Sequence, residues 1–192
     1  MQNIAILASG SGSNAEKIME YFSKNSQHGR IAAVLTNNST AGVQIRARKY
    51  GVPFVHISRK DWKKKNIVLP VFDDYKIDFI VLAGFLQMIP AYLIKHFGDN
   101  IVNIHPALLP LYGGKGMYGM NVHRAVYSNN EPDSGITIHR VNEIYDDGEI
   151  IFQARCTIDE DDSPEEIQRK VQVLEHKYFP MVINYLVANK GA

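Results

Sequence analysis

Cysteine is almost absent from this sequence, in which Cys156 is the only one among 192 residues. A single thiol excludes an internal disulfide framework and a metal site built from several cysteines, and it is typical of a reducing compartment. The sequence also has no run near the roughly 20 apolar residues that span a bilayer, and no cationic stretch before its first apolar segment. We therefore expect a cytoplasmic protein with no membrane partner.

An excess of charge is also missing, because 21 lysines and arginines oppose 20 acidic residues. This balance provides no electrostatic surface for nucleic acid, so any anionic ligand has to be held by local groups. His123 and His139 have no ligand-like spacing with a partner, and we predict no metal site. The 45% apolar content is enough for the core of a single domain over residues 1–192.

Short apolar runs in the first half alternate with longer mixed segments. The runs cover residues 4–7, 31–35, 79–82 and 101–104. Apolar strands separated by helix-length segments indicate βαβ units and a doubly wound, mostly parallel α/β sheet. Residues 135–141 and 150–158 have the pattern of two further strands joined only by an acidic turn, which favours an antiparallel pair in the C-terminal half.

A closing helix is predicted to begin after Ser163, which is followed by Pro164 at the first helical position and by Glu166 in a capping box. Apolar residues then recur every three or four positions, and Pro180 is expected to kink the helix. The predicted core-facing stripe consists of Ile167, Val171, Leu174, Tyr178, Val182 and Tyr185, with Gln172 and Glu175 along one edge.

The first predicted strand is followed by the turn Gly10-Ser11-Gly12-Ser13-Asn14. Glycines there allow backbone N–H groups to approach an anion at the positive end of the next helix. The same pattern occurs in dinucleotide sites, which also need an acidic residue about 20 positions further on. The second strand ends in Thr36-Asn37-Asn38-Ser39 without an acid, so a phosphate monoester is favoured over a dinucleotide. A tight turn that binds nothing remains the alternative.

Asn103 and His105 lie where a parallel strand ends, and open α/β sheets bind ligands at this end. Strand alternation directs both side chains to the same side, where an amide donor and a titratable imidazole can meet at one atom. The alternative is a structural histidine before a proline-ordered loop. Asp146, in the acidic turn, is either a solvated turn residue or, if it contacts His105, a carboxylate that raises the pKa of this imidazole.

Four motifs follow one another along the chain. They are Gly10-Ser11-Gly12-Ser13-Asn14, Ala83-Gly84-Phe85, Asn103-Ile104-His105-Pro106 with Leu108-Leu109-Pro110, and Asp146 with Gly148. In this combination the sequence resembles the phosphoribosylglycinamide formyltransferases, a folate-dependent formyltransferase family of purine biosynthesis, over its whole length. The resemblance implies a Rossmann-like formyltransferase fold. It also implies an enzyme that transfers the formyl group of 10-formyltetrahydrofolate to the amine of N1-(5-phospho-D-ribosyl)glycinamide, with these two small molecules as partners.

The resemblance assigns the site residues to three sets. The catalytic set is Asn103, His105 and Asp146. The substrate phosphate and ribose are assigned to Gly12, Ser13, Asn14, Gln172 and Glu175. The folate is assigned to Leu86, Gln87, Met88, Ile89, Asn103, Asn142, Glu143, Ile144, Tyr145 and Asp146. A protonated His105, its pKa raised by Asp146, is then expected to stabilise a tetrahedral oxyanion together with Asn103.

Two features depart from the family pattern. Gln87 stands where arginine is common, and the loop 113–120 is longer and richer in glycine than in shorter members, which leaves its role open. A basic residue is expected to meet the folate tail, and both Arg59 and Lys64 are candidates. The oligomeric state has no signature in the sequence.

Two other functions remain as alternatives. A 10-formyltetrahydrofolate deformylase would use the same catalytic set, with water in place of the amine. Deformylases resemble this domain with an additional N-terminal domain, whereas this sequence starts at its first strand, so we expect the transferase. A non-catalytic nucleotide-binding module would need only the glycine turn, and it makes no demand on Asn103, His105 or Asp146.

Overall fold

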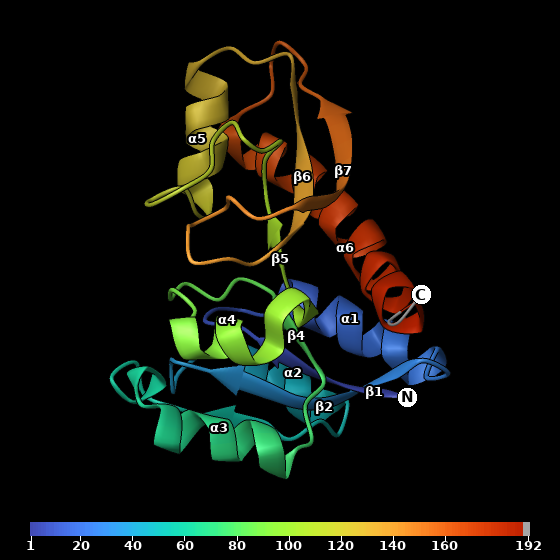
Figure 1. Ribbon diagram of the computed structural model, residues 1–192. Coiled ribbons are helices and arrows are strands. Elements are labelled where there is room, and N and C mark those ends of the chain that lie inside the picture. The colour runs from blue at the N-terminus through green and yellow to red at the C-terminus, as the bar shows by residue number, and fades with distance from the viewer. Residues whose placement is uncertain (190–192) are drawn as a thin grey trace.

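The computed structural model describes residues 1–189, which form a single seven-stranded sheet covered by helices (Figure 1). The last three residues of the predicted domain 1–192 lie outside this described part. The strands are β1 (Gln2–Leu7), β2 (Gly29–Thr36), β3 (Phe54–His56), β4 (Phe79–Leu82), β5 (Ile101–His105), β6 (Asp133–Arg140) and β7 (Ile150–Thr157). Their order is β3-β2-β1-β4-β5-β6-β7. The first five strands pair in parallel, and β6 is antiparallel to both β5 and β7, which confirms the predicted fold class.

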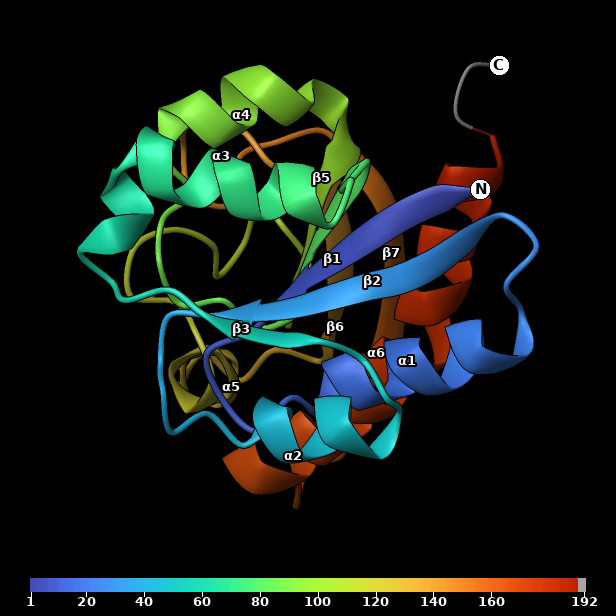
Figure 2. The same cartoon turned by 90° about the horizontal axis from the view of Figure 1, so that it is seen from below.

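Helices cover both faces of the sheet, as the view from below shows (Figure 2). Ile4 and Ile6 of β1 face one core, to which α1 (Ser13–Lys24), α2 (Val43–Lys49), α5 (Met120–Ser128) and α6 (Pro164–Ala188) contribute. Ala5 and Leu7 face the other core, which is completed by α3 (Lys65–Asp74) and α4 (Ala91–Phe97). Because neighbouring residues of β1 are buried on opposite faces, its sequence is apolar throughout, as in buried parallel strands generally.

The short strand β3 was not predicted from the sequence. It contains three residues, lies at the edge of the sheet and pairs only with β2. Only Phe54 and Val55 of this strand are apolar, which is too short a run for a periodic pattern to detect. The predicted strands 135–141 and 150–158 are confirmed as β6 and β7, with ends displaced by one or two residues.

Helix α6 begins as predicted, with Ser163 and Glu166 forming both hydrogen bonds of the capping box. The helix continues through Pro180 to Ala188. The predicted core stripe is correct for Ile167 and Val171 but wrong for Tyr185, which is 65% exposed. The stripe shifts because the helix packs on α5 and β6 in one part and on α1 in another, so the buried positions of its second half are Phe179, Pro180, Ile183 and Val187.

No helix within residues 1–189 combines the length and the apolar composition needed to cross a membrane. The loops that follow β1, β4 and β5 lie at the same edge of the sheet because these strands are parallel neighbours. The turn between β6 and β7 approaches this edge from the other side, since β6 runs antiparallel to β5. Four segments far apart in the sequence are thereby brought to one place.

Candidate active site

A cleft of about 500 Å³ lies at the carboxyl ends of β1, β4 and β5. Every residue of the three sets assigned by the resemblance lines this one cleft. These residues are Gly12, Ser13, Asn14, Leu86, Gln87, Met88, Ile89, Asn103, His105, Asn142, Glu143, Ile144, Tyr145, Asp146, Gln172 and Glu175. The glycine turn and the predicted catalytic set therefore belong to one continuous surface, which is the default location of a ligand in such a fold.

The glycine turn forms the N-terminus of α1 at one end of the cleft. Gly12 caps the helix with a φ of 75°, a left-handed conformation that favours glycine. A Cβ at this position would lie 2.5 Å from Cγ2 of Val43, so the backbone also has no room for a side chain. The first hydrogen bond of the helix is donated by the Glu16 amide to the Gly12 carbonyl. The amides before it are the positive, unpaired end of the helix, which suits an anion.

Helix α6 supports this turn through two side-chain hydrogen bonds. Asn14 Nδ2 donates to Glu175 Oε2 over 2.9 Å, and Gln172 Nε2 donates to Ser13 Oγ over 3.3 Å. Burial raises the pKa of Glu175, against the opposing effect of the Asn14 amide. Asn14 Oδ1 is buried and has no partner within the described residues. This end of the cleft thus combines helix amides with a buried amide oxygen that still has acceptor capacity.

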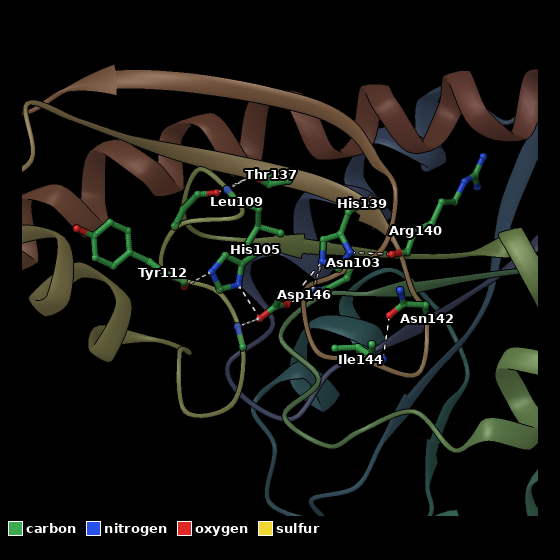
Figure 3. A network of polar contacts seen from close by, with 12 residues as sticks. Asn103, His105, Leu109, Tyr112, Thr137, His139, Arg140, Asn142, Ile144 and Asp146 are labelled. Atoms are coloured by element: carbon green, nitrogen blue, oxygen red, sulfur yellow. Dashed lines mark hydrogen bonds and ion pairs between the residues drawn. The ribbon is translucent and has the colours of Figure 1, made fainter.

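Asn103 and His105 project from β5 toward Asp146, which comes from the turn after β6 (Figure 3). His105 Nδ1 lies 3.5 Å from Asp146 Oδ2, and Asn103 Nδ2 lies 3.5 Å from Asp146 Oδ1. Asp146 has a φ of 55°, and its Oδ2 also accepts a 2.9 Å hydrogen bond from the Gly114 amide. The contact with His105 excludes the interpretation of Asp146 as only a solvated turn residue.

The imidazole of His105 is buried between two acceptors. Its Nε2 donates to the Tyr112 carbonyl over 2.8 Å, while Nδ1 faces Asp146. Burial lowers the pKa of His105 below its ordinary value, and the carboxylate and the carbonyl act in the opposite direction. As expected, Asp146 acts to raise the pKa of His105. Burial lowers this pKa by more, so the net shift is downward. The protonated form of this imidazole is therefore a stronger acid than free imidazolium.

Asp146 keeps its charge in this setting. Burial raises its pKa, but the hydrogen bond involving His139, the neighbouring His105 and the Gly114 amide together hold the pKa below the ordinary value. The carboxylate is consequently ionised at neutral pH, next to a buried imidazole that can accept a proton. Such a pair is suited to proton transfer at a reacting centre.

His139 belongs to the site, although the sequence indicated no role for it. It stands opposite Asn103 in the pairing of β5 with β6. Its Nδ1 lies 2.7 Å from the Arg140 carbonyl, which can only accept, so this nitrogen carries the proton. Its Nε2 lies 3.1 Å from Asn103 Nδ2 and 3.6 Å from Asp146 Oδ1. His139 thereby lies against the Asn103 amide, whose two N–H groups face His139 and Asp146, so a ligand oxygen bound by this amide replaces its 3.5 Å contact with Asp146.

His123 is a second histidine of the cleft that the sequence reasoning missed. It is 3% exposed, lies in the first turns of α5, and its Nδ1 has no partner within the described residues. Burial lowers the pKa of His123 to about 4, with a further contribution from His105. Alternation along β6 could have suggested His139, because Thr137 and His139 share one face, but no local pattern marks His123.

The loop 113–120 follows the catalytic strand and contributes to the cleft wall. Residues 114–119 line the cleft, and Gly114, Gly116 and Gly119 all have positive φ angles. The loop is attached at its start through the Tyr112 carbonyl and the Gly114 amide, which contact His105 and Asp146. Its glycines are therefore required by its backbone conformation.

Apolar side chains form two walls at the other end of the cleft. Leu86 and Met88 are exposed on one wall, and Ile144 and Tyr145 are exposed on the other. These side chains surround a space that suits a flat, partly apolar ring system. Arg59 and Lys64, the two candidates for the folate tail, do not line the cleft. Within residues 1–189, no group of three or more histidine, cysteine or acidic side chains is arranged to hold a metal ion.

Comparisons with known proteins show the family to which this chain is similar. The sequence model of the formyl transferase family matches residues 2–183. A phosphoribosylglycinamide formyltransferase of Escherichia coli (strain K12) is 32% identical over 189 residues, which cover 95% of this chain and 86% of the relative. A chloroplastic phosphoribosylglycinamide formyltransferase of Arabidopsis thaliana is 39% identical over 187 residues. Among solved structures, glycinamide ribonucleotide transformylase 1 from Symbiobacterium toebii has a TM-score of 0.89 at 28% identity, over 98% of this chain and 88% of that chain.

The extent of the matches differs between relatives. The match to the Arabidopsis protein covers 95% of this chain but 64% of the relative, and a second plant relative, from Vigna unguiculata, is covered over 61% of its length. The family model, in contrast, matches nearly the whole of this sequence. The chain therefore belongs to the formyl transferase family.

Proposed function

We propose that this chain transfers the formyl group of 10-formyltetrahydrofolate to the primary amine of N1-(5-phospho-D-ribosyl)glycinamide, a step of purine biosynthesis. The observation that carries the proposal is the position of Asn103, His105 and Asp146 in one cleft with the glycine turn. A nucleotide-binding module without catalysis has no need for this arrangement. The names of the bacterial and plant relatives support the same substrate.

The amine substrate occupies the end of the cleft at α1 in this proposal. Its phosphate binds the amides of Gly12, Ser13 and Asn14 at the positive end of the helix. Its ribose hydroxyls meet Gln172 and Glu175, the two side chains that already contact the turn. The glycinamide amine then points along the cleft toward His105.

The folate occupies the other end, between the exposed apolar walls. Leu86, Gln87, Met88 and Ile89 provide one wall with main-chain groups for the pterin ring, and the segment from Asn142 to Asp146 provides the other. The formyl group is thereby placed next to Asn103. Both ligands are small molecules, and no metal takes part in the proposed reaction.

The proposed chemistry is direct acyl transfer. The amine nitrogen attacks the formyl carbon, and the carbonyl becomes a tetrahedral oxyanion that accepts hydrogen bonds from Asn103 Nδ2 and the protonated His105. The attacking nitrogen loses a proton to Asp146, through a bridging water, and N10 of the folate takes a proton from His105 as its bond to the formyl carbon breaks. Each proton lost is balanced by one gained, and the enzyme forms no covalent intermediate.

The requirement for the amine tests this function against hydrolysis. The protein is incubated with 10-formyltetrahydrofolate, with and without the glycinamide ribonucleotide, and tetrahydrofolate is followed spectroscopically. We expect tetrahydrofolate to form only when the amine is present. Equal rates in its absence would support a deformylase, and no reaction in either case would support the non-catalytic module.

Gly12→Ala is expected to raise KM for the ribonucleotide by more than about tenfold, while KM for the folate stays within about twofold. The new Cβ would collide with Val43, and the positive φ is unfavourable for alanine, so the phosphate-binding amides must move. Steady-state kinetics with each substrate varied separately provide the measurement. Gly51→Ala is the matched control, because Gly51 also has a positive φ but has open space around it and lies outside the cleft. Equal changes in both KM values for Gly12→Ala would contradict the assignment.

We further propose that Arg59, and not Lys64, meets the negatively charged tail of the folate. The Arg59 carbonyl accepts from the Gln87 side chain over 3.3 Å, which places Arg59 next to the folate wall. Lys64 is instead paired with Asp61 over 2.8 Å. Arg59→Ala is expected to raise KM for a polyglutamylated folate by about three- to tenfold, and Lys64→Ala is expected to leave this KM unchanged. A raised KM in Lys64→Ala with an unchanged KM in Arg59→Ala would assign the folate tail to Lys64 instead.

We propose that the chain is one catalytic domain over residues 1–192 and that it works in the cytoplasm. The single cysteine supports a reducing compartment. The names of the two plant relatives specify the chloroplast for those proteins.

A further inference from the structure

A chain of side-chain hydrogen bonds connects the end of β1 to the folate wall. Ser9 Oγ accepts from the Leu86 amide over 3.0 Å and donates to Asn37 Oδ1 over 2.7 Å. Asn37 Nδ2 donates to Gln87 Oε1 over 3.1 Å, and Gln87 Nε2 donates to the Arg59 carbonyl over 3.3 Å. We call Ser9, Asn37 and Gln87 the relay. The Ser9 hydroxyl and the side-chain amides of Asn37 and Gln87 are all hydrogen-bonded, so these bonds form together in one arrangement.

The relay starts from a rigid base. Ser9 and Asn37 are 6% and 4% exposed; Asn37 directly follows β2, and Ser9 lies two residues beyond the end of β1. The Ser9 amide is itself bonded to the Gly84 carbonyl over 3.0 Å. Buried polar side chains with complete hydrogen bonding hold their neighbours in one geometry, because breaking one bond leaves a buried group unsatisfied.

The segment that the relay holds has no regular secondary structure. Phe85 and Ile89 are buried in the core beneath it, while Leu86 and Met88 between them are exposed in the cleft. The two apolar anchors set the position of the segment but not the orientation of its peptide groups. The Leu86 amide and the Gln87 side chain are the points at which hydrogen bonds set this orientation.

We infer that Ser9, Asn37 and Gln87 are positioning residues for the folate: they fix the main-chain orientation of Leu86–Ile89 and thereby determine affinity for the formyl donor. This inference rests on the proposed function. It also explains why glutamine serves where the family often has arginine, because position 87 here both accepts from Asn37 and donates to Arg59. A guanidinium has no acceptor and cannot make the first of these bonds.

The relay predicts a selective change in folate binding. Gln87→Leu, which removes both of its bonds at a half-buried position, is expected to raise KM for 10-formyltetrahydrofolate by about five- to tenfold. KM for the ribonucleotide and kcat at saturating substrates are expected to stay within about twofold. Gln87→Glu retains the acceptor for Asn37 and is expected to recover part of the loss. Gln27→Leu, at an exposed glutamine far from the relay in the sequence, is the control.

This experiment distinguishes a wrong inference about the relay from a wrong proposed function. Wild-type protein without amine-dependent transfer would overturn the function. Wild-type transfer with an unchanged folate KM in Gln87→Leu, or with equal increases in both KM values, would overturn the relay. Ser9→Ala provides a second variant at the buried end, and its folate KM is expected to rise at least as much. Titration of each variant with 5-formyltetrahydrofolate, followed by tryptophan fluorescence, measures the same affinity without turnover.

Discussion

Replacing His105 by alanine is expected to lower kcat for formyl transfer by about 100- to 1,000-fold, because removal of one donor to an oxyanion typically costs about 2.7–4 kcal/mol of barrier. His105 is 3% exposed, and its Nδ1 lies 3.5 Å from Asp146 Oδ2. KM for either substrate is expected to change little, since neither ligand depends on the imidazole for its main contacts. Steady-state rates with both substrates saturating give the measurement.

Two controls separate this effect from unfolding and from nucleophilic catalysis. Thermal unfolding of His105→Ala, followed by circular dichroism, shows whether the variant retains the fold. Cys156→Ala is expected to keep wild-type activity, because the thiol lies on β7 outside the cleft and burial raises its pKa away from the reactive thiolate. Turnover of His105→Ala near the wild-type rate would exclude the proposed mechanism.

Asp146→Asn is expected to lower kcat by about 100-fold or more while preserving the shape of the side chain. The charge that raises the pKa of His105 disappears, and the effect of burial, which lowers this pKa, remains unopposed. The fraction of protonated His105 at pH 7 therefore falls. Because the proposed transfer needs the imidazolium, the alkaline limb of the pH–rate profile is expected to move to lower pH in the variant.

The pH–rate profile of the residual activity measures this shift. Asp147→Asn is the matched control, since Asp147 is the exposed neighbour and lies outside the cleft. Its kcat and its profile are expected to stay close to those of the wild type. A profile of Asp146→Asn that keeps the wild-type alkaline limb would show that Asp146 does not act through His105.

The central sheet could be predicted from the sequence because its strands are buried on both faces. Residues 79–82, for example, are all apolar and all buried, and they appear as β4 without a change of bounds. The three residues of β3 could not be predicted in this way, because an edge strand with two apolar residues is too short to give a pattern. In the second half of α6, the predicted residues Tyr178 and Val182 are half-buried against the core, and only Tyr185 was placed on the wrong face.

The site could be predicted in part for similar reasons. Strand alternation places Asn103 and His105 on one side of β5, and the turn chemistry of Gly12 requires glycine. The approach of Asp146 depends on the antiparallel pairing of β6 with β5, which no local pattern contains. The same pairing brings His139 opposite Asn103. The net lowering of the His105 pKa could not be predicted from the sequence either, because it depends on how completely the cleft wall encloses the imidazole.

The fate of the formyl carbon tests direct transfer most directly. 10-Formyltetrahydrofolate labelled with 13C in the formyl group is mixed with the glycinamide ribonucleotide and the protein, and the products are followed by 13C NMR. The account predicts that the label appears only in the new formamide of the ribonucleotide. Label recovered as free formate at the rate of folate release would contradict it.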